Sequence, residues 1–257
     1  GKGNNIEEKG KTSFPHSMGH VYAALTQYLG FKANSDEWKV MGLAPYGDPE
    51  KYYKEFESII DFDRNKGELR FDLNYFTYYM WSPRRYSNQL LELFGPERYK
   101  DDEISGRHRD IAASFQKRVE DVIIEMCVFL YKKTGSKNLC LAGGVAMNSR
   151  MNGRILSEGP FGKVWVQPSA DDAGCSIGAC FYYWNQVLRK KRAFQMEHDY
   201  WGPRFTNDEI ESVLKDSLLS YTRYEDIEVV TADLIAKGNI VGWFQGRMEM
   251  GQRALGN

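Results

Sequence analysis

Two adjacent glycines, Gly143 and Gly144, lie where a short apolar run of strand length gives way to a helical segment. Glycine has no Cβ, so paired glycines let backbone N–H groups approach a phosphate, and a helix N-terminus favours negative charge. Asn148, early in that helix, can exchange a hydrogen bond with a ribose or a base. A tight turn that only packs strand against helix has the same pattern, and spacing alone favours this plainer interpretation.

A second turn, residues 168–174, follows the next predicted strand and carries Asp171 and Asp172. Carboxylates at the C-terminal end of a parallel strand lie where open α/β sheets bind ligands, and they suit a hard or borderline metal ion. An aspartate at this place can equally cap the helix that follows. The residues alone leave both interpretations open.

A third segment, residues 246–257, combines glycines with Arg247 and Arg253. Arginine presents a forked set of donors that matches phosphate or carboxylate, and glycines keep the backbone approachable. We therefore predict an anion-binding segment here, in preference to a solvated loop.

The elements that position these turns follow from hydrophobic periodicity. Apolar residues at helical spacing predict helices over residues 14–30 and 110–133, the second long and largely buried. Residues 38–47 contain two glycines and a proline and are expected to form a structured loop. Residues 81–98 are expected to form a mobile loop.

Apolar runs at residues 138–142 and 163–167 each lead through a glycine-containing turn into a helix. This repeated order implies crossover units and an α/β fold with a central sheet covered by helices. A basic, polar segment at 189–204 is the best candidate for a domain boundary. Beyond it, Thr206 is expected to cap a helix, and short strands are predicted at 227–230 and 240–244.

Composition narrows the functional classes. Lys and Arg (34) nearly balance Asp and Glu (35), which gives no electrostatic reason to expect a nucleic-acid or membrane partner. No apolar run approaches the roughly 20 residues that span a bilayer, and no signal peptide is visible. Four cysteines without CxxC spacing are expected to be reduced core thiols of a cytoplasmic protein: Cys127, Cys140, Cys175 and Cys180. The missing initial Met and the end inside a motif predict an excised fragment.

Several motifs occur together in a fixed order, and the chain resembles the O-carbamoyltransferases that modify nodulation factors and antibiotics. The motifs are FPHSMG (14–19), YLGF (28–31), EWKVMGLAPYG (37–47), DIAASFQ (110–116), LCLAGGVAMN (139–148), VQPSADDAG (166–174) and GRMEMGQRALGN (246–257). The resemblance runs nearly the whole length and is weakest at 50–108 and 185–235.

The resemblance implies an α/β fold with two parts. Residues 1–199 would be part of an actin-like, ribonuclease H-type domain related to the tRNA threonylcarbamoyl transferases. Residues 200–257 would begin a YrdC-like domain, cut short. Such enzymes make carbamoyl adenylate from carbamoyl phosphate and ATP, and then pass the carbamoyl group to an acceptor hydroxyl. The implied partners are thus carbamoyl phosphate and a hydroxyl-bearing small molecule, and a homodimer is compatible with them.

The resemblance also assigns residues. Asp172 would be the carboxylate ligand of a divalent metal, usually iron. Gly143, Gly144 and Asn148 would line the ATP, and Glu37, Lys39 and Gly42 would belong to the facing wall. Arg247 and Arg253 would open the carbamoyl-adenylate domain and carry the catalytic role. The family's HxxxH metal pair would lie upstream of this chain, which is therefore expected to be inactive alone.

Departures from the family pattern are few: Asp171 replaces a glycine, Gln252 a proline and Ser149 a cysteine. His16 and His20 also form an HxxxH pair with metal-ligand spacing. We interpret them as packed helix-face or pocket histidines, because they fall in the FPHSMG segment. His108 and His198 are expected at the surface.

Two alternatives remain for the function. One is a non-catalytic actin-fold module that binds a nucleotide without transfer. The other is tRNA threonylcarbamoylation, which the motifs at 37–47 and 246–257 disfavour because they belong to the small-molecule branch.

Overall fold

The computed structural model describes residues 1–80 and 82–254 and has a mixed α/β fold. The chain divides into two units, Gly1–Lys191 and Arg192–Asn257. The division falls inside the basic segment predicted to hold a boundary.

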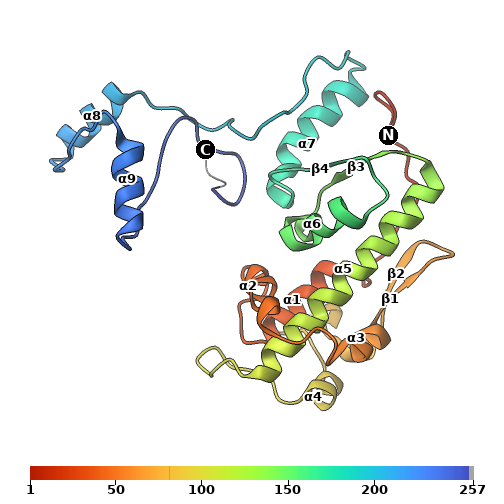
Figure 1. Cartoon of the computed structure of the whole chain (residues 1–257). Coiled ribbons are helices and arrows are strands. Elements are labelled where there is room, and N and C mark those ends of the chain that lie inside the picture. Colours follow the sequence, from red (N-terminus) through yellow and green to blue (C-terminus); the bar gives the residue numbers. More distant parts are fainter. Residues whose placement is uncertain (81, 255–257) are drawn as a thin grey trace. The chain divides into compact units, whose positions relative to one another are not determined.

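A single long helix, α5 (Gly106–Thr134), organises the first unit. Ser105 begins it with a capping box, and Gly135 ends it in the left-handed conformation at φ 63°. Figure 1 shows α1 to α4 gathered along one half of α5, and α6 with strands β3 and β4 along the other. The predicted long, buried helix is confirmed.

The larger apolar core lies between α5 and the helices that precede it. These are α1 (Met18–Tyr28), α2 (Glu37–Leu43), α3 (Tyr53–Ile59) and α4 (Asn88–Phe94). The largest side chains fully buried in this core are Tyr28, Tyr86, Phe56, Phe76, Phe94, Phe115, Leu25, Leu29, Ile59, Ile60, Leu90 and Ile111. Ser17 caps α1 by accepting a hydrogen bond from His20 N, as predicted.

Two loop predictions in this region are wrong. Residues 38–47 form most of α2 and a 3-10 turn, Ala44–Tyr46, because Val40 and Ala44 are buried in spite of the neighbouring glycine and proline. The segment predicted as a mobile loop contains α4, since Leu90 and Phe94, one helical turn apart, both enter the core. Trp81 lies outside the described residues.

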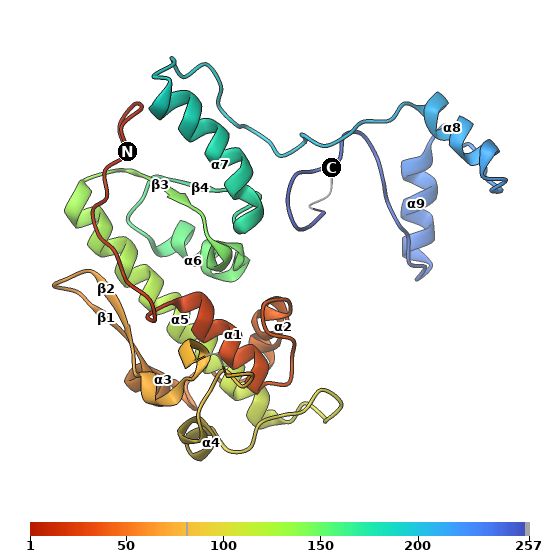
Figure 2. The same ribbon diagram turned by 180° about the vertical axis from the view of Figure 1, so that it is seen from behind.

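Two small sheets complete the first unit (Figure 2). Strands β1 (Ile60–Asp63) and β2 (Glu68–Phe71) pair antiparallel, with Ile60 opposite Phe71. Strands β3 (Asn138–Leu141) and β4 (Lys163–Val166) pair in parallel, with Leu139 opposite Val164. The predicted central sheet therefore has two parallel strands within the described residues.

A second, smaller core lies beside β3 and β4, with α6 (Ser149–Glu158) packed on α5. Helix α7 (Cys175–Tyr182) continues into a π-helical turn, Tyr183–Val187. The expectation of four core thiols is wrong: all four are free, but only Cys127 is buried. Strand β3 has a single described neighbour and α7 buries none of its residues, so the other three thiols are exposed.

The second unit contains α8 (Asn207–Asp216) and α9 (Ile227–Ala236). Thr206 caps α8 in a capping box with Glu209, which confirms the predicted cap. The predicted strand at 227–230 is wrong, because this run continues into a ten-residue helix. Residues 240–244 are not assigned to a strand either. No helix among the described residues is long and apolar enough to cross a membrane.

Candidate functional site

The Gly143–Gly144 turn joins β3 to α6 by way of a 3-10 turn, Gly144–Met147. Gly143 has φ 100°, a conformation that side chains other than glycine rarely adopt. A Cβ placed on either glycine would meet no described atom within 4 Å. The backbone of this turn is therefore open to a ligand.

The second turn lies directly beside the first. Because β3 and β4 run in parallel, both turns leave the same edge of the pair. Gly143 N donates a hydrogen bond of 2.5 Å to Ala170 O. The structure thus brings together the two turns that the sequence singled out.

The two aspartates of the second turn have different roles. Asp171 Oδ1 accepts a hydrogen bond from Ala173 N at 3.3 Å and caps the short 3-10 turn Asp172–Gly174. Asp172 is exposed. The capping role considered for this turn therefore falls to Asp171, while the Asp172 carboxylate stays accessible.

Asn148 is buried where the first turn meets α6. Its Oδ1 caps the helix by accepting from Met151 N at 3.0 Å, and its Nδ2 donates to Gln116 Oε1 on α5 at 3.0 Å. The side chain thus fixes the start of α6 relative to α5.

Helix α2 carries the three residues predicted as the facing wall. Glu37 Oε1 accepts from Asn34 N at 2.6 Å. Lys39 Nζ pairs with Asp36 at 3.0 Å and lies 5.4 Å from the centre of the Trp38 ring. Gly42 is exposed, and a Cβ there would meet nothing within 4 Å.

Helix α2 reaches the start of α6 through Met41. Ser149 Oγ lies 3.7 Å from Met41 Sδ. The wall helix and the glycine turn therefore belong to one neighbourhood of the first unit.

The histidine pair at the start of α1 is packed against aromatic rings. His16 Nδ1 accepts from Phe71 N at 3.1 Å, and the His20 ring stacks on Tyr78 with 5.3 Å between centroids. Burial and the nearby Arg85 lower the pKa of His20. The described residues contain no group of three His, Cys, Asp or Glu side chains able to hold a metal. These contacts support the interpretation of packed histidines.

His108 corrects the expectation of a surface residue, while His198 is exposed as expected. His108 is buried in the first turn of α5, where its Nδ1 accepts from Ser105 N at 3.1 Å. Its Nε2 lies 3.1 Å from the Arg107 guanidinium. His108 therefore helps to cap α5, a role that the polar residues around it in the sequence do not indicate.

In the second unit, Arg247 lines a pocket of about 430 Å³ together with His198, Tyr200, Trp201, Arg204 and Gly246. Arg247 pairs with Arg204 across an isolated antiparallel bridge and donates from Nε to Gly202 O at 3.1 Å. Two cationic side chains on one pocket suit an anionic ligand. Arg253 is exposed and does not line this pocket.

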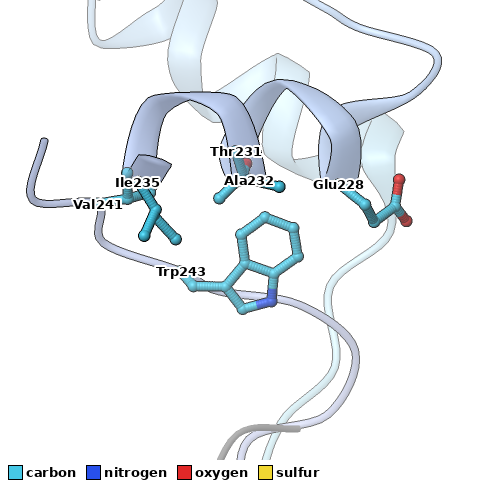
Figure 3. Close-up of a pocket in the computed structure, with 6 residues that line it drawn as sticks. All are labelled: Glu228, Thr231, Ala232, Ile235, Val241 and Trp243. Atoms are coloured by element: carbon cyan, nitrogen blue, oxygen red, sulfur yellow. The ribbon is translucent and has the colours of Figure 1, made fainter. Parts of the chain in front are cut away.

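A second hollow, of about 330 Å³, lies beside α9. Figure 3 shows Trp243 facing Ala232 and Ile235 of the helix across it. Its lining is mainly apolar and contains none of the predicted site residues. We assign it no part in the site.

Sequence reasoning missed Glu120, a buried carboxylate on α5 that pairs with two arginines of α6. Glu120 Oε1 lies 3.1 Å from Arg150 Nε, and Oε2 lies 3.2 Å from an Arg154 Nη. The sequence does contain a sign of it: a charged residue on the buried face of a helix needs a partner.

Family models match both units of the chain. A model described as carbamoyltransferase N-terminus matches residues 1–181, and one described as carbamoyltransferase C-terminus matches residues 232–257.

Individual relatives match over nearly the whole chain. An uncharacterized protein of Synechocystis sp. is 43% identical over 100% of this chain and 43% of its own length. The nodulation protein NolO of Bradyrhizobium diazoefficiens is 38% identical over 95% of this chain and 43% of its own. The nodulation protein NolNO of Sinorhizobium fredii is 36% identical over 99% and 36%. The chain thus spans less than half the length of these relatives.

Proposed function

The chain belongs to the carbamoyltransferase family, and we propose that it forms part of an enzyme that moves a carbamoyl group from carbamoyl phosphate to a hydroxyl of a small molecule or sugar. The match of the N-terminal family model to residues 1–181 carries this proposal. We also propose that the first unit is part of an actin-like domain and that the second begins a YrdC-like domain.

ATP is proposed as the activating co-substrate, bound at the Gly143–Gly144 turn. The residues fit a phosphate group, since both glycines face open space where the 3-10 turn Gly144–Met147 begins, and neither carries a Cβ that would keep a phosphate away from the backbone. Asn148 would set the position of the turn, and Glu37, Lys39 and Gly42 of α2 would form the opposite wall. Arg247 and Arg253 would hold the anionic carbamoyl donor.

A metal ion, with iron as the expected one, would take Asp172 as a ligand. Its carboxylate is exposed beside the glycine turn, which suits that role. The described residues do not complete a metal shell, since they hold no group of three ligating side chains. Asp172 is therefore the single ligand that we assign within them.

The proposed reaction passes through carbamoyl adenylate, a mixed anhydride of carbamate and AMP. Transfer of its carbamoyl group forms a bond from the acceptor oxygen to the carbamoyl carbon. The bond from that carbon to the AMP oxygen breaks, and the hydroxyl proton passes to a base. The Gly143 N–H donates to Ala170 O, so the backbone N–H of Gly144 would stabilise the negative charge on departing AMP. The wall of α2 would limit access of water.

An assay of the intact protein tests the proposal. Purified protein is incubated with ATP, with and without carbamoyl phosphate, and AMP release is measured. We expect AMP only when carbamoyl phosphate is present. ATP binding without carbamoyl-phosphate-dependent AMP would instead identify a nucleotide-binding module without transfer activity.

We expect residues 1–257 alone to give no sustained turnover with ATP, carbamoyl phosphate and ferrous iron, because one assigned carboxylate binds a metal weakly. Turnover above a no-protein control would contradict this expectation.

A further inference from the structure

A buried polar cluster connects α1, α5 and the end of the glycine turn. At its centre is the Gln116 side chain, which is 1% exposed. Its Oε1 accepts from the Tyr22 hydroxyl at 2.8 Å and from Asn148 Nδ2 at 3.0 Å. Its Nε2 donates to Glu120 Oε1 at 2.8 Å and to Asn148 Oδ1 at 3.1 Å. All four hydrogen-bonding positions of this amide are therefore used.

The chemistry of the neighbours fixes which way each amide points. The ionised Glu120 carboxylate only accepts hydrogen bonds, so the NH2 group of Gln116 must face it. Burial raises the pKa of Tyr22, so its hydroxyl stays protonated and donates to the remaining oxygen. Asn148 Oδ1 must face Met151 N, which is a donor. One arrangement satisfies all these groups.

Asn148 in turn fixes the glycine turn. It is the last residue of the turn and the N-cap of α6, and its own N donates to Val145 O at 3.0 Å. Val145 packs against both apolar cores, so the turn is held from inside by its side chain and at its end by Asn148. Because Asn148 N holds Val145 O, we expect a shift of Asn148 to move the turn that begins at Gly143 and Gly144.

We propose that Gln116 is a positioning residue that, through Asn148, holds the Gly143–Gly144 turn in the orientation that receives nucleotide phosphates. The inference rests on the proposed function, because it takes that turn as the ATP site. Gln116 touches no substrate; it acts by keeping Asn148 in one rotamer and one amide orientation.

Gln116→Glu in the intact protein tests this role. The change keeps size and helix propensity but replaces two N–H donors with an acceptor beside Glu120. We expect ATP to bind at least 10-fold more weakly than to the natural protein at pH 7.5, by calorimetry. Burial at position 116 and the neighbouring Glu120 raise the pKa of the introduced carboxyl, against the opposite effect of Arg150 and Arg154, which pair with Glu120. At pH 5 more of this carboxyl carries a proton and donates again. The ratio of the two dissociation constants should therefore shrink at pH 5.

Ser114→Ala is the matched control. Ser114 is fully buried two residues away on α5, but its hydroxyl accepts from Tyr52 N at 3.1 Å and donates to Asp48 O at 3.3 Å, and both partners lie outside the glycine turn. We expect lower stability with an unchanged ATP affinity. Equal weakening in this control, or a ratio for Gln116→Glu that does not change with pH, would show a merely structural role and overturn the inference.

The outcomes separate the inference from its premise. If the natural protein binds no ATP, the proposed nucleotide site fails and the inference falls with it. If it binds ATP and folded Gln116→Glu binds equally well, only the inference fails. Should Gln116→Glu not fold, Tyr22→Phe takes its place, since it removes one donor to Gln116. Several-fold weaker binding is then expected, and an unchanged affinity would overturn the inference.

Discussion

At the scale of single residues, the neighbouring Asp171 and Asp172 have different roles. Asp171 caps a turn, a role that asparagine fulfils equally well, whereas Asp172 is exposed and free of that role. We expect Asp172→Asn in the intact protein to abolish metal-dependent transfer, and Asp171→Asn to change it less than about threefold. Transfer rates and bound iron, measured together, check this; the reverse ranking would refute Asp172 as the ligand.

A substitution at Gly144 can test the approach of a ligand to the backbone without disturbing the fold. A Cβ there meets nothing within 4 Å and its φ is not positive, so the fold has room for a side chain. Gly144→Val should therefore weaken ATP binding by at least 10-fold while the unfolding midpoint stays within about 2 °C, a small effect for a surface substitution. Unchanged affinity by calorimetry would place the nucleotide elsewhere. Gly143 is a poorer test, because its φ of 100° would strain any substitute.

The buried His108 gives the protein a predictable response to acid. Burial, followed by the charges of Arg107 and Arg98, lowers its pKa, against a smaller opposite effect of Asp102. In the unfolded chain the His108 imidazole binds a proton near pH 6.5, whereas in the folded chain it binds one only at lower pH. The free energy of unfolding therefore loses nothing to His108 above pH 6.5 and falls as pH drops below that value. His20, also with a lowered pKa, acts in the same direction.

Urea unfolding at pH 7.5 and 5.5 measures this response. The midpoint should fall at the lower pH, and His108→Gln should make the fall smaller, because glutamine can complete the capping box without titrating. An identical fall in this variant would assign the response to other groups.

At the scale of elements, Gly47 sets how closely the segment after α2 can approach α5. A Cβ on Gly47 would lie 2.1 Å from Arg109 O, a backbone atom that cannot move aside. We expect Gly47→Ala to destabilise the protein by about 1–3 kcal/mol through overpacking. Gly153 inside α6 faces open space, so Gly153→Ala should stabilise it by about 0.5–1 kcal/mol. Denaturant titration of both variants checks the opposite signs, and equal signs would contradict the packing argument.

Elements with strong periodicity or a clear cap were predictable from the sequence, and those decided by tertiary contacts were not. The helix α5, the strands β3 and β4 and the cap at Thr206 follow from local pattern. Helix α4 could not be predicted in this way, because the surrounding sequence is aromatic and charged. The helix forms because Leu90 and Phe94 are buried in the core. The run IEVV at 227–230 fits strand or helix equally, and the residues that follow decide.

The candidate site divides in the same way. Parallel strands bring their C-terminal turns together by topology alone, so the closeness of Gly143 and Ala170 could be expected. The cluster around Gln116 could not, since it joins side chains 94 and 32 positions apart along the chain. Which of two adjacent aspartates caps the turn also depends on backbone angles that no spacing rule gives.

On the scale of the whole molecule, the two units match different family models, one for the N-terminal part and one for the C-terminal part of carbamoyltransferases. The N-terminal model ends at residue 181 within the first unit, and the C-terminal model begins at residue 232 within the second. Residues 182–231 match neither model. The stretch that neither model matches therefore includes the boundary between the units.

Helix α5, about 43 Å long at 1.5 Å per residue, is shared by both apolar cores of the first unit. Ile123 packs against both of them. Neither core can open without exposing part of the helix that supports the other, so amide exchange in α1 and in β3 should report one cooperative event. Because Ile123 is only partly buried, Ile123→Ala should cost about 0.5–3 kcal/mol and accelerate exchange in both elements by a similar factor. Amide hydrogen exchange, measured by mass spectrometry, that accelerates in only one of the two elements would mean that the two cores open independently.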